Sequence, residues 1–168
     1  TPNIEKKGLN NFLMILISLV AQERLPHVPG TEESTMDIVD GIDAAQIIIQ
    51  LLLKEKLSHT TYHITNGNSA LTIKTLHKMI EEKWKKRIPV QYHGDAASFL
   101  KNIQQIWIDK PDMQKIYKKA ESFLMEPAYP KVFDNTHTLS ELNIKELEKN
   151  PVDVLHGMFS DKLWNLSE

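Results

Sequence analysis

Cysteine is absent from the 168 residues of this sequence, and neither sign of charge dominates it. Without thiols the chain forms neither disulfides nor thiolate metal sites, and a cysteine-free composition favours a reducing, cytoplasmic location. The net charge of −2 gives no strong field that would attract a polyanion. We therefore expect no nucleic-acid partner.

Glycine-rich turns are also missing. The sequence has six glycines, and none of them is spaced as GxGxxG, GxxGxxG, GxxxxGK[ST] or GxSxG. Such turns let the backbone approach a phosphate at a helix N-terminus or expose a nucleophilic serine. No tyrosine is followed four residues later by a lysine, which could lower the pKa of the phenol for proton transfer. We therefore expect no catalytic residue and no bound cofactor in this chain alone.

Hydrophobic runs are short. The longest, Phe12 to Ala21, is too short to cross a membrane, which takes about 20 residues. It is followed by Gln22, Glu23 and Arg24 rather than by the small residues of a signal-peptide cleavage site. A peripheral membrane role for the helix predicted at 10–24 stays open as the weakest alternative.

Helices are predicted where apolar residues recur every three or four positions behind a capping residue. The prolines of 25–35 predict a loop there. The predicted helices are 10–24, 44–53 behind Asp40, a helix behind Thr72 with Ile73 to Trp84, one behind Asp95 with Phe99 to Trp107, one from Pro111 carrying Ile116, Tyr117, Ala120 and Phe123, one at a capping box Thr138–Glu141, and one from Pro151.

Strands are predicted at 36–39, 60–65 and 88–92, where β-branched and aromatic residues cluster. Parallel sheets are normally covered on both faces, so strands this few and this short do not make a self-sufficient sheet. We therefore expect part of the sheet to come from outside the chain.

The sequence contains only a weak signal for a metal site. His59 and His63 are four residues apart, but Thr60, Thr61 and Tyr62 between them are typical of a strand, and no HExxH motif is present. We expect no metal site.

Four segments in one order carry a family resemblance, and a fifth follows near the C-terminus. They are Leu25–Gly30 (LPHVPG), Met36–Ala45 (MDIVDGIDAA), Tyr62–Gly67 (YHITNG), Leu71–Leu76 (LTIKTL) and Val132–Thr136 (VFDNT). The chain resembles the C-terminal part of extended short-chain dehydrogenases/reductases, of the epimerase/dehydratase superfamily, in the thioester-reductase and fatty-acyl reductase ("male sterility") branch. The resemblance covers 25–80 well and 131–160 loosely. One departure is Ile42, where the family usually has an aspartate.

The resemblance implies an α/β fold, mostly helical: the C-terminal portion of an extended Rossmann-type reductase with about three short strands. Residues 1–58 would be the last part of the nucleotide-binding domain with its substrate loop, and 59–168 one compact helical substrate-binding lobe. NADP or NAD would be held by the intact parent protein, whose cofactor turn and catalytic Tyr and Lys lie upstream. The substrate would be an acyl thioester or a similar carbonyl compound, free or bound to a carrier protein.

The same resemblance places a substrate pocket around the 25–35 loop. The residues expected to line it are Pro26, His27, Val28, Pro29 and Met36. The competing interpretation is a non-catalytic helical interaction module derived from a reductase. Such a module would pair as a homodimer through the exposed face of its incomplete sheet, because bare apolar faces and unpaired strand edges favour association.

Overall fold

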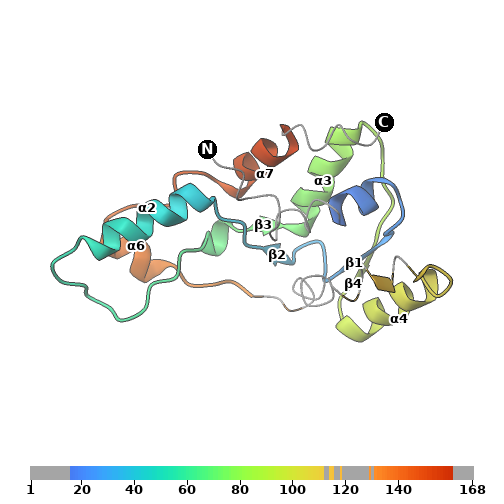
Figure 1. The fold of residues 1–168 in the computed structure, drawn as a ribbon, viewed down its shortest axis with the longest axis horizontal. Coiled ribbons are helices and arrows are strands. Elements are labelled where there is room, and N and C mark those ends of the chain that lie inside the picture. The colour runs from blue at the N-terminus through green and yellow to red at the C-terminus, as the bar shows by residue number, and fades with distance from the viewer. Residues whose placement is uncertain (1–15, 112–113, 116–117, 119–128, 130, 161–168) are drawn as a thin grey trace. The chain divides into compact units, whose positions relative to one another are not determined.

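The computed structural model describes residues 16–111, 114–115, 118, 129 and 131–160. The chain forms two compact units, and each is discontinuous in sequence. Unit 1 consists of Thr1–Ser34 and Thr72–Pro130, and unit 2 of Thr35–Leu71 and Lys131–Glu168. These boundaries differ from the division into 1–58 and 59–168 that the family resemblance implies. Within the described residues the protein is α/β, and helices hold far more residues than strands do (Figure 1).

A short parallel strand pair lies at the centre of unit 1. Strand β1 (His27–Pro29) pairs with β4 (Gln91–His93), with His27 opposite Gln91 and Pro29 opposite His93. The prediction of a loop throughout 25–35 is thus wrong at β1, and the strand predicted at 88–92 lies slightly later. Pro29 is compatible with β1 because this strand has one partner, and proline occurs where its missing N–H is not needed.

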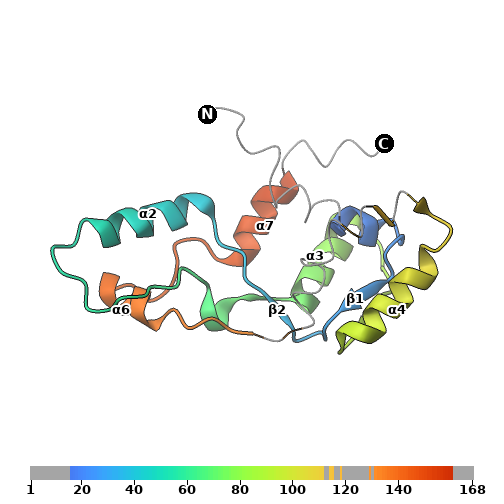
Figure 2. The same ribbon diagram turned by 60° about the horizontal axis from the view of Figure 1, so that its bottom comes forward.

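Helices α3 (Ile73–Trp84) and α4 (Ala96–Ile106) begin where the sequence predicts. The Thr72 hydroxyl accepts a hydrogen bond from the Thr75 N–H, and the Asp95 carboxylate accepts one from the Ser98 N–H, which confirms both caps. Figure 2 shows α4 beside β1. The buried apolar side chains of unit 1 include Ile17, Leu76, Met79, Ile80, Ile88, Phe99, Ile103 and Trp107.

Unit 2 contains α2 (Gly41–Leu52), which lies beside α6 (Thr136–Leu142), and the helix α7 (Pro151–Ser160) (Figures 1 and 2). Asp40 caps α2 by accepting from the Ile42 and Asp43 N–H groups, as predicted. A short 3-10 helix, η2, spans Gly67–Ser69. The apolar core of the unit contains Ile47, Leu51 and Leu147, with Val39, Tyr62, Ile64 and Leu142 packed against it.

The remaining sheet is smaller than predicted. Strand β2 (Thr35–Met36) pairs with β3 (Leu71–Thr72), in place of a strand at 36–39. Residues 60–65 are not a strand. Side chains bind their carbonyls instead: the Thr138 hydroxyl donates to His63 O, and Asn135 Nδ2 donates to Thr65 O. The predicted strand fails because these partners come from α6 and its cap, which local sequence does not reveal.

The capping box predicted at Thr138–Glu141 is wrong as well. Helix α6 begins two residues earlier, at Thr136, and Thr138 is a fully buried interior residue of it. Glu141 does not reach back to the helix N-terminus, because its carboxylate accepts hydrogen bonds from Tyr62 Oη and the Ser58 N–H. The helix from Pro151 is confirmed as α7.

Two predicted helices extend beyond the described residues. Of the helix predicted at 10–24, residues 16–21 are helical and 10–15 lie outside the described part. Of the helix predicted from Pro111, residues 111, 114–115 and 118 are helical, and the predicted face of Ile116, Tyr117, Ala120 and Phe123 lies outside it. No helix among the described residues is long and apolar enough to cross a membrane.

Candidate functional site

Four of the five predicted pocket residues lie together on β1 or directly before it. The Pro26 carbonyl accepts a hydrogen bond from the Gln91 N–H, and His27, Val28 and Pro29 form the strand itself. Pro26, His27 and Val28 are half-buried, whereas Pro29 is buried. Met36 lies on β2 and belongs to unit 2. The candidate site is therefore built on the β1–β4 pair.

A pair of histidines joins these two strands. His27 Nδ1 lies 2.7 Å from His93 Nε2, a distance at which one ring donates its N–H to the other. His93 is buried and also contacts the Phe99 ring of α4. Burial, and then the neighbouring His93, lower the pKa of His27. The lowered pKa favours the neutral form of the His27 ring.

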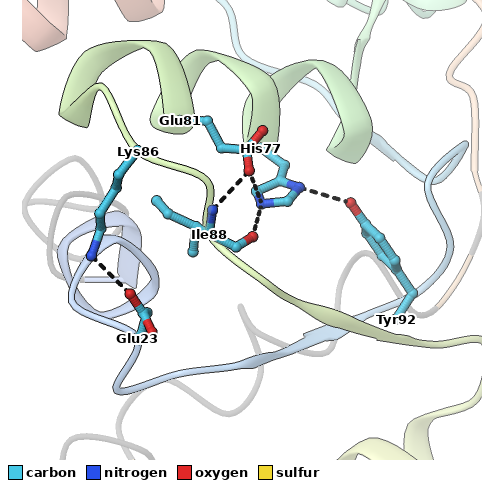
Figure 3. Close-up of polar contacts among 6 residues, drawn as sticks. All are labelled: Glu23, His77, Glu81, Lys86, Ile88 and Tyr92. Atoms are coloured by element: carbon cyan, nitrogen blue, oxygen red, sulfur yellow. Dashed lines mark hydrogen bonds and ion pairs between the residues drawn. The ribbon is translucent and has the colours of Figure 1, made fainter.

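The other side of β4 is bonded to α3 through Tyr92 (Figure 3). Tyr92 Oη lies 3.3 Å from His77 Nδ1, and His77 Nε2 lies 2.8 Å from the Ile88 carbonyl oxygen. A carbonyl only accepts, so Nε2 of His77 carries the hydrogen, and Nδ1 is then the acceptor for the Tyr92 hydroxyl. When the His77 ring is neutral, the tautomer with the hydrogen on Nε2 is the one that fits these two contacts.

Glu81 completes the network from the same helix. Its Oε1 accepts the Ile88 N–H at 2.8 Å and lies 3.8 Å from His77 Nε2 (Figure 3). His77 and Glu81, one helical turn apart, therefore hold both backbone groups of Ile88. Beside them, Lys86 Nζ and Glu23 Oε1 form an ion pair at 3.0 Å. The bonds to Ile88 hold the segment that enters β4 against α3, and the ion pair joins the same segment to Glu23.

The phenol of Tyr92 is a donor and not an activated acid. Burial, and then the charge of Glu32, raise its pKa, and the nearby Lys74 lowers it by less. Lys74 is itself paired with Glu32 at 2.7 Å, so the two opposite charges partly offset each other at the phenol. A raised pKa keeps the phenol protonated, which suits hydrogen bonding to His77 and does not suit proton transfer near neutral pH.

The sequence did not indicate His77, Glu81, Tyr92 or His93 as site residues. The i, i+4 spacing of His77 and Glu81 on a predicted helix was a usable signal, because such residues lie on one face. Alternation along the predicted strand would have placed Tyr92 and His93 on opposite sides. The pairing of His27 with His93 spans 66 residues, and no local pattern reports it.

In unit 2, three of the segments that carry the family resemblance contact one another. The Asp37 carboxylate accepts from both the N–H and the Nδ2 of Asn66. Asn135 in turn donates from Nδ2 to Thr65 O. Gly67 has φ +56°, and a Cβ there would lie 2.9 Å from Asn135 Oδ1, so glycine is required on both counts. Segments 36–45, 62–67 and 132–136 thus form one polar cluster.

The histidines considered as metal ligands have other contacts. His63 Nδ1 donates to Asp134 O, and the His59 ring stacks on His137 with centroids 3.6 Å apart. Within the described part of the chain, no group of three or more His, Cys, Asp or Glu side chains is placed to hold a metal ion.

This chain matches no family model, no curated protein and no solved structure.

Proposed function

We propose that this chain is the substrate-binding C-terminal part of an NAD(P)-dependent oxidoreductase that reduces an acyl thioester or a similar carbonyl compound. In this proposal the chain contributes no catalytic residue. The parent protein supplies the glycine-rich turn for the cofactor and the tyrosine and lysine for proton transfer. The proposal rests on the order of five sequence segments that resemble extended short-chain reductases.

The observation that carries the proposal is the polar cluster of unit 2. The segments Met36–Ala45, Tyr62–Gly67 and Val132–Thr136 are far apart in the chain, and their order is part of the resemblance. Asp37, Asn66 and Asn135 are hydrogen-bonded across these segments, with distances of 2.8–3.0 Å. Residues that a family keeps for one shared cluster are expected to contact one another, so this arrangement supports treating the segments as one pattern.

The half-buried strand β1 is the part we assign to the substrate. His27 and Val28 are partly accessible, and Pro29 fixes the backbone beside them. His27 offers one ring nitrogen beyond its bond to His93, which suits a hydrogen bond to a carbonyl compound. Val28 supplies an apolar surface for an acyl chain.

The test is to express the protein with the sequence that precedes Thr1 in its gene and to follow NADPH or NADH oxidation with acyl thioesters. A glycine-rich turn and a Tyr-x-x-x-Lys pair are expected upstream, and His27→Ala is expected to raise KM more than it lowers kcat. Lys115→Gln is the matched control, because Lys115 is exposed and lies outside the candidate site. Absence of the upstream motifs, or of cofactor oxidation with every thioester, would reject the proposal.

One observation favours the second candidate, a homodimerising interaction module. Helix α2 and its C-cap residue carry an exposed aliphatic stripe that includes Ile42, Ile49, Leu52 and Leu53, the last two 77% and 79% exposed. The stripe has no charged residue, so a second copy of the same surface can cover it without burying charge. The apolar surface observed is therefore on a helix, whereas the sequence predicts dimerisation through a sheet face.

Sedimentation at increasing concentration tests this candidate. A dimer that dissociates in Leu52→Glu and persists in Gln50→Glu, an exposed position on the same helix, would support it. A strict monomer at all concentrations would exclude it.

A further inference from the structure

The second half of α4 borders a hollow of about 620 Å³ in unit 1. This volume is within the range of small-molecule sites, roughly 300–1,000 Å³. One wall is formed by α4 and the turn after it, which supply Lys101, Gln104, Gln105 and Ile108; the other is supplied by Gln114 and Lys118, two helical residues four positions apart. The residues that line it are Lys101, Ile103, Gln104, Gln105, Trp107, Ile108, Gln114 and Lys118.

The base of the hollow is rigidly held. Ile103 and Trp107 are 0% and 2% exposed, and Trp107 Nε1 donates a hydrogen bond to the Arg24 carbonyl oxygen. Gln114 Nε2 donates to the carbonyl oxygens of Trp107 (2.9 Å) and Ile108 (2.8 Å), and so fixes the second wall to the C-terminal end of α4. The geometry of the hollow therefore does not depend on a ligand to assemble it.

The charges around the hollow have one sign. Lys101 and Lys118 are its only charged lining residues in the described part of the chain, and neither forms an ion pair there. Other described lysines do form ion pairs, as Lys74 does with Glu32 and Lys86 with Glu23. Two unpaired ammonium groups beside one concave surface raise the local concentration of anions.

We propose that this hollow binds a small phosphate monoester whose body carries an amide. The two ammonium groups suit a dianion, since lysine binds phosphate as a point charge. The exposed amides of Gln104 and Gln105 offer donors and acceptors to an amide, and Ile108 offers an apolar contact. The site is separate from the β1 residues assigned to substrate above and does not depend on that assignment.

The first measurement is a titration of the ¹⁵N-labelled 168-residue chain with N-acetyl-phosphoserine amide. Saturable shifts are expected at the side-chain amides of Gln104 and Gln105 and at the Trp107 indole N–H. N-acetylserine amide, which lacks the phosphate, is expected to cause no saturable shift. Equal shifts with both compounds, or shifts that never saturate, would overturn the proposal. If inorganic phosphate bound as tightly as the amide-bearing ester, the assignment of the amide would be overturned.

The second measurement compares lysine variants by the same titration. Lys101→Gln and Lys118→Gln are each expected to weaken binding roughly two- to fivefold, as for an exposed charge pair, and the double variant by about the product of the two. Lys115→Gln, an exposed lysine outside the lining, is the matched control and is expected to bind like the wild type. Equal losses in all three single variants would mean a general surface attraction and no site. Unchanged backbone spectra establish that each variant is folded.

Discussion

At the scale of single residues, the hydrogen bond between His27 and His93 is expected to depend on pH. The two ring nitrogens lie 2.7 Å apart, so they can share one proton but cannot both carry one. The pKa of His27 in the folded protein is lowered, first by burial and then by His93. Between this lowered value and the ordinary histidine value of about 6.5, the unfolded chain binds the proton and the folded chain does not.

We therefore predict that the β1–β4 pair keeps its full stability above about pH 6.5 and loses it progressively as the pH falls through the lowered pKa of His27. Hydrogen exchange at the Gln91 amide, which binds the Pro26 carbonyl, is the local measurement. The pH dependence is expected to disappear in His27→Asn and to remain in the control His156→Gln, at an exposed histidine of α7. The same slope in His27→Asn would contradict the assignment.

A second prediction at the scale of single residues concerns Asp37. Its carboxylate accepts from both the backbone N–H and the side chain of Asn66, at 3.0 and 2.8 Å. Asp37→Ala leaves the partly buried donors without this partner, which costs about 1–3 kcal/mol of unfolding free energy. Urea unfolding followed by circular dichroism measures the loss. Asp109→Ala, at an exposed aspartate, is expected to be close to neutral, and a loss as large there would point to a general charge effect.

At the scale of elements, the helix caps are the most local features of the fold. Asp95 Oδ1 accepts from the Ser98 N–H at 2.8 Å, and this bond is the main cause that lowers the pKa of Asp95. We predict that Asp95→Ala lowers the unfolding free energy, whereas Asp95→Asn restores most of it. The capping contribution of the carboxylate is present above its unfolded pKa of about 3.9 and falls as the pH drops through the lower folded value. A stable Asp95→Ala variant would show that packing, and not the cap, fixes the start of α4.

The caps at Asp40, Thr72 and Asp95 could be predicted because a cap depends on residues within one turn of it. The strands could not be predicted equally well, because each depends on a distant partner. His27–Pro29 contains a proline and has the composition of a loop, yet it pairs with residues 91–93. Residues 60–65 have strand composition, yet Thr138 and Asn135 take the carbonyls that a neighbouring strand would need.

The candidate site, like the strands, depends on contacts between residues that are distant in the sequence. His27 was predicted as a pocket residue from the family resemblance; in β1 it lies opposite Gln91, and its ring hydrogen-bonds His93, two residues further along β4. The tautomer of His77 depends on Tyr92 and on the Ile88 carbonyl, which local sequence could not connect. Their i, i+4 spacing could have placed His77 and Glu81 on one face of the helix, but not shown which groups that face binds.

At the scale of the whole molecule, we predict that the isolated chain neither binds NADPH nor oxidises it. The sequence has no glycine-rich phosphate turn, and its tyrosines lack a following lysine four residues on. The two tyrosines whose pKa shifts are resolved, Tyr62 and Tyr92, have raised values, which leaves no activated phenol at either. Fluorescence titration with NADPH is the measurement. Saturable binding at micromolar concentrations would contradict both this prediction and the proposed division of labour with an upstream domain.

The interleaved course of the chain also has a consequence for its synthesis. The peptide passes from one unit to the other near residues 34, 71 and 130, so each unit is made from two separate stretches. On the ribosome, α2 and the Asn66 turn emerge well before α6, whose Thr138 and cap residue Asn135 bind the 62–67 stretch. At about 5–20 residues per second, the first half of unit 2 waits several seconds for its second half. During that interval the aliphatic side chains of α2 are a natural target for a chaperone, and a nascent chain stopped near residue 130 would keep them unprotected.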